Sequence, residues 1–196
     1  MKRKSVLAML LAVLMLLTVN PVALAYSDTE KIDVKTVSVD YPDFIKNMDY
    51  YNKLASEGYL VHIKVGEQYK KQEEARLALL SENNKQILTQ EMTRGSSYPT
   101  SAWNLATQGQ YNFSGRGPVY TNYYFNGKVD MNVYVHNSNS LSMRVQIFDS
   151  FISDTTAAAA FDVPGGDSVL YQYNRRVTSG KVAIYFLSSY FDGYIN

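Results

Sequence analysis

The stretch VYTNYYF, residues 119–125, concentrates aromatic side chains that also form hydrogen bonds. Side chains alternate between the two faces of a β-strand, so Tyr120 and Tyr124 share one face, and Tyr123 and Phe125 share the other. We expect Tyr123 and Phe125 to be structural. Tyr120 and Tyr124 would then lie on an outer face, where tyrosine rings can stack on a sugar or contact another protein. The alternative is that they only cover a sheet surface or pack under N-terminal helices.

Two further ligand-binding candidates come from the polar faces of two other predicted strands. KVDMNVYVHN, residues 128–137, places Tyr134 on the outer face, and LSMRVQIF, residues 141–148, does the same for Arg144. The candidate binding residues are therefore Tyr120, Tyr124, Tyr134 and Arg144.

The residues that could support catalysis are few. His62 and His136 are the only histidines, so a Ser-His-Asp site would have to use one of them. His136 is expected to be exposed at the end of a predicted hairpin. No G-x-S-x-G, H-E-x-x-H or P-loop pattern occurs, and the Asp residues after position 95 form no recognisable glycosidase pair. We therefore expect a non-enzymatic protein without a cofactor.

Calcium is the one metal that the sequence makes plausible. Four carboxylates lie near predicted strand ends, where carboxylate and carbonyl oxygens could converge: Asp149, Asp154, Asp162 and Asp167. Their spacing matches no calcium loop, and the chain has no cysteine for a thiolate site. We assign no metal ligands.

The N-terminus has the features of a secretory signal peptide. Lys2, Arg3 and Lys4 precede an apolar segment, and Ala23 and Ala25 form a small-x-small cleavage site. We expect residues 1–25 to be removed, with the mature chain beginning near Tyr26 and, without a membrane anchor, either released or held at the cell surface non-covalently.

The composition limits the possible partners. Removal of the three N-terminal bases would leave 16 basic and 18 acidic residues, a balance that argues against nucleic acid. Without cysteine, an exported chain must be stabilised by its core alone. An extracellular glycan or protein is the expected partner, with no membrane insertion after cleavage; the sequence does not indicate the oligomeric state.

The chain changes character near residues 94–97, which predicts two regions. Residues 26–95 are rich in charge, and their apolar spacing predicts helices over 41–57 and 67–94, separated by a short extended segment at 59–66. The charged face of the second helix is expected to be solvated, with a partner-binding role for 67–94 as the alternative. Residues 96–196 contain 11 of the 17 tyrosines and 7 of the 8 phenylalanines.

The second region reads as a series of short strands. Seven are predicted between turn signals, at 110–115, 119–125, 129–136, 141–148, 157–163, 168–174 and 182–187. We predict that 129–147 forms a hairpin in which Val133 pairs with Met143 and Val135 with Leu141. The predicted fold class is α+β: a helical N-terminal region followed by an antiparallel, immunoglobulin-like β-sandwich that folds independently.

Several segments after Trp103 carry a resemblance to known proteins: WNL, YNFSG, VYTNYYFNGK, VYVHN, DVPGGDSVLYQY, SGKVAIYF and FDGYI. Residues 103–195 resemble the C-terminal portions of small exported proteins of Gram-positive bacteria. This resemblance implies an extracellular sandwich and no particular activity. We expect a secreted, non-catalytic protein that binds a glycan or protein through exposed aromatic residues. The alternatives are an assembly protein that uses the 67–94 helix, or an extracellular hydrolase.

Overall fold

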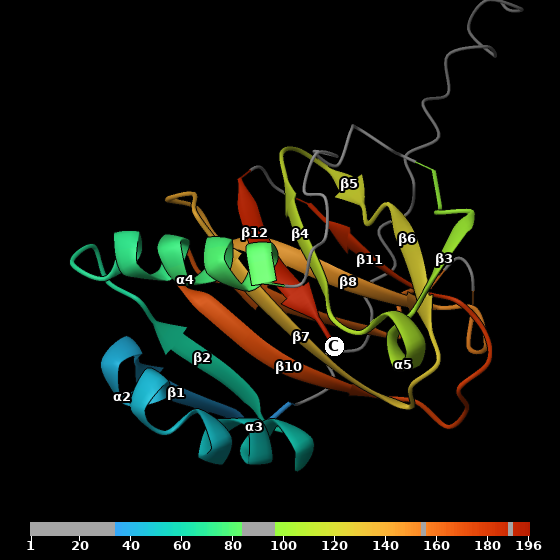
Figure 1. Ribbon diagram of the computed structural model, residues 1–196, viewed down its shortest axis with the longest axis horizontal. Coiled ribbons are helices and arrows are strands. Elements are labelled where there is room, and N and C mark those ends of the chain that lie inside the picture. Colours follow the sequence, from blue (N-terminus) through green and yellow to red (C-terminus); the bar gives the residue numbers. More distant parts are fainter. Residues whose placement is uncertain (1–33, 84–96, 154–155, 188–189) are drawn as a thin grey trace, which may run out of the picture. The chain divides into compact units, whose positions relative to one another are not determined.

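The computed structural model describes residues 34–83, 97–153, 156–187 and 190–196, all within one compact unit, Lys31–Asn196. The predicted signal peptide, the expected mature start near Tyr26 and the last part of the predicted 67–94 helix lie outside these residues. β-Strands are the most abundant elements of the described chain, and they are arranged in two sheets (Figure 1).

Sheet A contains strands from both ends of the described chain. Its strand order is β1-β2-β10-β7-β12-β4. The bounds are β1 Thr36–Asp40, β2 Leu60–Lys64, β10 Ser168–Asn174, β7 Asp130–Asn137, β12 Phe191–Ile195 and β4 Tyr111–Gly115. β1 and β2 pair in parallel, and the other neighbours are antiparallel.

Sheet B has the order β3-β6-β11-β8-β9, and β5 also pairs with β11. The bounds are β3 Ser101–Asn104, β5 Val119–Tyr120, β6 Tyr123–Asn126, β11 Val182–Phe186, β8 Met143–Asp149 and β9 Ala159–Val163. A four-residue helix, α5 Leu105–Gln108, follows β3. Within residues 96–196 the strands pair antiparallel, as predicted, except for the parallel pair of β3 and β6.

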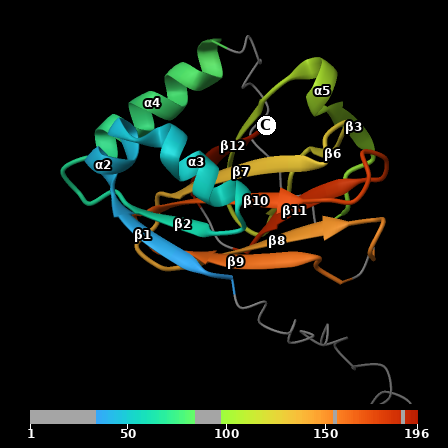
Figure 2. The same ribbon diagram turned by 90° about the horizontal axis from the view of Figure 1, so that it is seen from below.

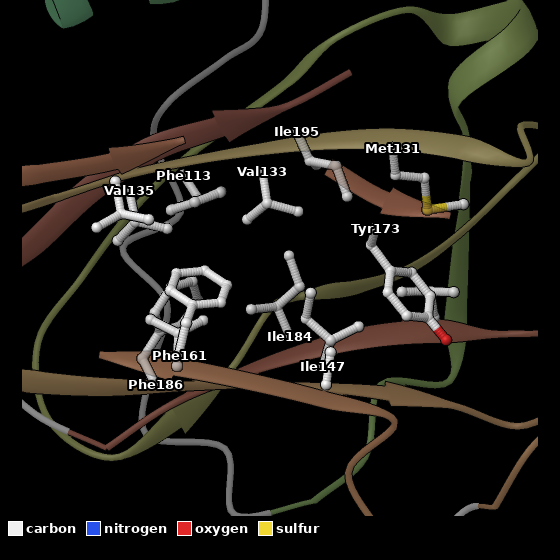
Figure 3. Close-up of a cluster of buried hydrophobic side chains, with 14 of the residues drawn as sticks. Phe113, Met131, Val133, Val135, Ile147, Phe161, Tyr173, Ile184, Phe186 and Ile195 are labelled. Carbon is white, nitrogen blue, oxygen red and sulfur yellow. The ribbon is translucent and has the colours of Figure 1, made fainter. Parts of the chain in front are cut away.

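The two sheets lie face to face around the main apolar core (Figures 2 and 3). Sheet A contributes Met131, Val133 and Ile195, and sheet B contributes Ile147 and Ile184. The predicted β-rich, two-sheet architecture is confirmed. Burying one apolar face of each sheet against the other is the main reason that the sheets associate.

Three helices cover the outer face of sheet A: α2 Tyr41–Lys46, α3 Met48–Ser56 and α4 Lys70–Asn83 (Figure 2). The prediction for 41–57 holds, with a break at Asn47. Phe44, Tyr51 and Ala55 are buried against the sheet. Gly58, at φ +89°, follows the C-cap Glu57 and supplies the left-handed residue that commonly terminates a helix.

Two strands from before position 84, β1 and β2, are part of the same sheet as the C-terminal strands. β2 pairs with β10, and β1 completes the edge beyond β2. The structure therefore does not separate the predicted helical region, 26–95, from the predicted sandwich, 96–196. β1 was not predicted, because a strand as short as TVSVD carries little periodic signal.

The predicted hairpin of β7 and β8 is wrong, although its core face is right. Six residues of the predicted apolar rows are buried in the main core, as expected: Met131, Val133, Val135, Met143, Val145 and Ile147. The two outermost, Val129 and Leu141, are exposed, so their prediction as core residues is wrong. However, β7 pairs with β10 and β12 in sheet A, and β8 pairs with β11 and β9 in sheet B. The apolar residues of β7 and β8 therefore face each other across the core instead of lying side by side in one sheet. Both edges of β7 are already paired, with β10 and β12, so β8 cannot pair with it.

Candidate functional site

The outer face of sheet B combines aromatic and polar side chains from several strands. The predicted strand 119–125 is interrupted at Thr121, whose N–H donates to the Ile184 carbonyl and whose hydroxyl donates to the Tyr123 carbonyl at 2.9 Å each. This break divides the strand into β5 and β6. Phe125 still points into the core with Tyr123 packed beside it, as predicted, so Tyr124 belongs to the outer face.

Tyr120 is the centre of a cluster of four rings on this face. Its ring centroid lies 4.6 Å from that of Tyr185, 5.6 Å from Phe148 and 5.7 Å from Tyr98. Phe148 is buried, whereas Tyr98, Tyr120 and Tyr185 are half-buried. We call these four residues the tyrosine cluster. Its rings support one another, so each remaining exposed edge is held in a fixed orientation.

Lys181 connects Tyr124 to the tyrosine cluster. The Tyr98 hydroxyl donates to the Lys181 carbonyl at 3.0 Å, and the Lys181 Nζ atom lies 5.1 Å from the centroid of the Tyr124 ring. Tyr124, which was predicted from sequence to share a face with Tyr120, is therefore linked to the tyrosine cluster through Lys181, which also places a cation beside the Tyr124 ring.

Polar side chains on β8 and β9 extend the same face. Gln146 lies opposite Tyr185 in the register, and Arg144 lies opposite Asp162. The Arg144 Nη1 atom donates to Asp162 Oδ2 at 3.1 Å, and both side chains are partly exposed. An amide and an ion pair therefore stand beside the aromatic rings, which together offer stacking surface and hydrogen-bonding groups.

No helix in the described part of the chain covers this face (Figure 2). The helices α2, α3 and α4 pack on sheet A, and Leu105 of α5 packs into the main core. Burial, with a smaller contribution from Tyr185, raises the pKa of the Tyr120 hydroxyl. A tyrosine hydroxyl is protonated at neutral pH even without such a shift, so the Tyr120 hydroxyl can donate a hydrogen bond there.

Tyr134 does not belong to this face, so its prediction as an exposed ligand-binding residue is wrong. It lies on the outer face of sheet A, completely buried under α4, and its hydroxyl donates to Glu73 at 2.5 Å. His136, predicted to be exposed, is also fully buried and contacts Ser168. Strand alternation identified the correct face for both residues, but it did not reveal that helices cover it.

Three members of the cluster were missed from sequence: Tyr98, Phe148 and Tyr185. Alternation in LSMRVQIF and VAIYFL does place Phe148 and Tyr185 on outer faces. The sequence did not predict that β11 pairs with both β5 and β8, and this pairing brings the rings together. Tyr98 lies outside any strand, and no periodic signal marks it.

Of the four carboxylates considered as calcium ligands, three form ion pairs in the structure and one lies outside the described residues. Asp149 pairs with Arg175, Asp162 with Arg144 and Asp167 with His62, while Asp154 lies outside the described residues. Within the described ranges, no three His, Cys, Asp or Glu side chains are grouped as metal ligands. Among those same residues, none of the helices has the length and apolar character needed to cross a bilayer.

The chain matches no protein-family model, and a search of curated proteins finds no match either.

Proposed function

We propose that this protein is an exported binding protein and that the outer face of sheet B recognises an extracellular glycan. The observation that carries the proposal is the tyrosine cluster, an ordered group of rings on a sheet face that no described helix covers. Glycans bind where aromatic rings can stack on the apolar face of a sugar and nearby polar groups bond its hydroxyls.

The neighbouring polar groups support this ligand class. Gln146 supplies both a donor and an acceptor, while Arg144 and Asp162 supply one donor and one acceptor group of opposite charge. A protein partner through the same face is the alternative, and it would use the rings as buried anchors.

The proposal is tested by screening the purified protein on a glycan array and measuring the affinity of any hit by calorimetry. Replacing Tyr120 and Tyr185 with Ala is expected to lower affinity at least tenfold, because aromatic anchors typically contribute about 1–2 kcal/mol or more each. Tyr50→Ala is the matched control, since Tyr50 is an exposed tyrosine on α3. Retention of binding in the double variant, with folding intact, would exclude the tyrosine cluster as the site.

The cellular setting belongs to the same proposal. The signal-peptide pattern in residues 1–25 and the resemblance over 103–195 support export from a Gram-positive bacterium and a sandwich related to immunoglobulin-like domains. Intact-mass measurement of protein recovered from the culture medium is expected to give a chain beginning near Tyr26. Recovery of the full 196-residue chain would contradict cleavage at this site.

A further inference from the structure

Ser38, His62 and Asp167 form a hydrogen-bonded chain at the β1 edge of sheet A. Ser38 and His62 are register partners in the parallel pair of β1 and β2, and the Ser38 Oγ atom lies 3.3 Å from His62 Nδ1. On the other side of the ring, His62 Nε2 lies 2.8 Å from Asp167 Oδ2. A hydroxyl, an imidazole and a carboxylate in this order are the components of a nucleophilic site.

Asp167 determines which ring nitrogen of His62 carries the proton and which faces Ser38. An ionised Asp167 only accepts hydrogen bonds, so the proton of neutral His62 lies on Nε2. Nδ1 then carries a lone pair directed at the Ser38 hydroxyl, which is the arrangement that a general base requires. The two ring nitrogens exchange the roles that they have in chymotrypsin-like triads, but the chemistry of proton transfer is the same.

Asp167 is held rigidly by its surroundings. Its Oδ1 atom accepts from the Val65 N–H at 3.0 Å, and its carbonyl accepts from the Asn137 N–H at 2.9 Å. Its own N–H donates to the Pro164 carbonyl at 3.2 Å. The carboxylate therefore orients His62 with little freedom to turn away, which is what the orienting member of a triad must do.

The reacting end of the chain is open to solvent, whereas its support is sheltered. Ser38 is exposed on the terminal strand of the sheet, and the side chains of His62 and Asp167 are each 20% exposed. The second histidine provides a contrast. His136 also contacts a serine, Ser168 at 3.0 Å, but both residues are fully buried, so no substrate can reach that pair.

We propose that Ser38 is a nucleophile that accepts an acyl group from an ester, with His62 as its general base and Asp167 as the residue that positions His62. The Ser38 oxygen attacks the ester carbonyl carbon while its proton moves to His62 Nδ1. The bond to the leaving alcohol then breaks, and His62 returns the proton to that oxygen. Water, deprotonated by His62, then attacks the acyl carbon. The bond between that carbon and Ser38 Oγ breaks, and His62 returns the proton to Ser38 Oγ, so that ester and water yield acid and alcohol.

Lys64 is the residue that we assign to the developing negative charge. It is exposed, lies two residues after His62 and therefore starts from the same face of β2. Its register partner is Asp40, two residues after Ser38 on β1. From this position, the flexible Lys64 ammonium group is able to approach the ester carbonyl oxygen, which becomes anionic when Ser38 attacks.

The experiment uses two probes on the purified protein: a biotinylated fluorophosphonate, which labels activated serines, and p-nitrophenyl acetate, an activated ester. Peptide mapping is expected to place the phosphonate on Ser38, and Ser38→Ala is expected to abolish labelling. His62→Gln should slow labelling about 100-fold, because a positioned general base typically contributes that much or more. Asp167→Asn should slow it at least tenfold, and Lys64→Met should lower kcat for the ester with KM little changed.

Thr36→Ala is the matched control, because Thr36 is an exposed hydroxyl residue on the same face of β1 but faces Leu60 instead of histidine. It should react like the wild type. Ser38 is exposed and its hydrogen bond to His62 lies at the surface, so Ser38→Ala should leave the melting temperature nearly unchanged. Loss of labelling in a variant with that melting temperature is then not caused by unfolding. An unlabelled Ser38 in the wild type, or label and esterase activity that survive in Ser38→Ala, would overturn the proposal.

Discussion

A single buried carboxylate, Glu73, holds helix α4 on sheet A. It is fully buried and accepts hydrogen bonds from Arg76 Nε at 2.7 Å, Arg76 Nη2 at 2.8 Å and the Tyr134 hydroxyl at 2.5 Å. The Arg76 guanidinium also lies 4.8 Å from the Tyr134 ring centroid. Burial opposes ionisation of Glu73, but these bonds outweigh it and leave the Glu73 pKa below its ordinary value.

Replacing Glu73 with Gln is therefore expected to destabilise the protein by about 3–5 kcal/mol, because Arg76 would lose its charge partner in a sheltered site. Urea unfolding at neutral pH measures this change. Since the folded-state pKa of Glu73 is lowered, its contribution is present above the unfolded value and is lost as pH falls through the folded one. Glu74→Gln, at the next and exposed position, is the control and should change stability by less than about 0.5 kcal/mol. A similar small effect for Glu73→Gln would show that α4 does not depend on this pair.

Asp192 has the opposite pH dependence. Burial, reinforced by Glu73 and Glu74 and opposed by Arg76, raises its pKa to about 7, and its Oδ1 atom has no hydrogen-bond partner. A raised folded-state pKa gives stability that is complete below the unfolded value, 3.8, and is lost as pH rises through about 7. Ionised Asp192 therefore weakens the fold at alkaline pH.

Asp192→Asn is accordingly expected to stabilise the protein at pH 8 by about 2 kcal/mol and to have little effect at pH 4. Melting temperatures of both proteins, measured across this pH range, test the expectation. If the difference in melting temperature between the two proteins is the same at every pH, the carboxyl of Asp192 is not the group that titrates.

At the scale of elements, the connection from β7 to β8 carries the chain from one sheet to the other, and Asn137 fixes it. Its amide Nδ2 donates to the carbonyls of Leu141 at 2.8 Å, Val163 at 3.0 Å and Pro164 at 3.3 Å, and its Oδ1 accepts from the Asn139 N–H. The side chain is fully buried. One amide therefore ties this crossing to the turn after β9.

Asn137→Ala is expected to cost about 2–3 kcal/mol, because it leaves buried carbonyls without a donor. Chemical unfolding measures the loss. Ser138→Ala, at the adjacent residue, is the control, since no side-chain bond of Ser138 takes part in this crossing, and it should be nearly neutral. Equal stability of the two variants would mean that other contacts fix the crossing.

The connection between β7 and β8 also shows which features the sequence could predict and which it could not. The alternation of residues 129–148 correctly gave the core faces of β7 and β8, because alternation depends only on which side is buried. It could not give their partners, because an NSNS loop can close a hairpin or lead to the opposite sheet. The same limit applies to the candidate site. Alternation correctly predicted that Tyr120, Tyr124 and Arg144 share a face. It could not predict that a helix covers Tyr134, because alternation along a strand carries no information about what packs on its outer face.

At the scale of the whole molecule, the change in composition near residues 94–97 is not a boundary in the fold. It predicted that residues 96–196 would fold alone. In the structure, β10 pairs on one side with β2, from the N-terminal part, and on the other with β7. The outer face of sheet A also depends on that part, because Tyr134, Leu170 and Tyr194 pack against helices α2, α3 and α4 in one buried cluster.

We therefore expect residues 96–196, made alone, to be insoluble or to melt without cooperativity. Exposing Tyr134, Leu170 and Tyr194 would cost about 1.5–3 kcal/mol each, which together approaches the 5–15 kcal/mol that typically separates folded from unfolded domains. Loss of β2 would in addition leave one edge of β10 unpaired. Thermal unfolding followed by circular dichroism tests this, with the compact unit Lys31–Asn196 as the control that should melt in one transition. A cooperative transition for 96–196 near the temperature of the control would show that the β1–β2 edge and its helices are dispensable.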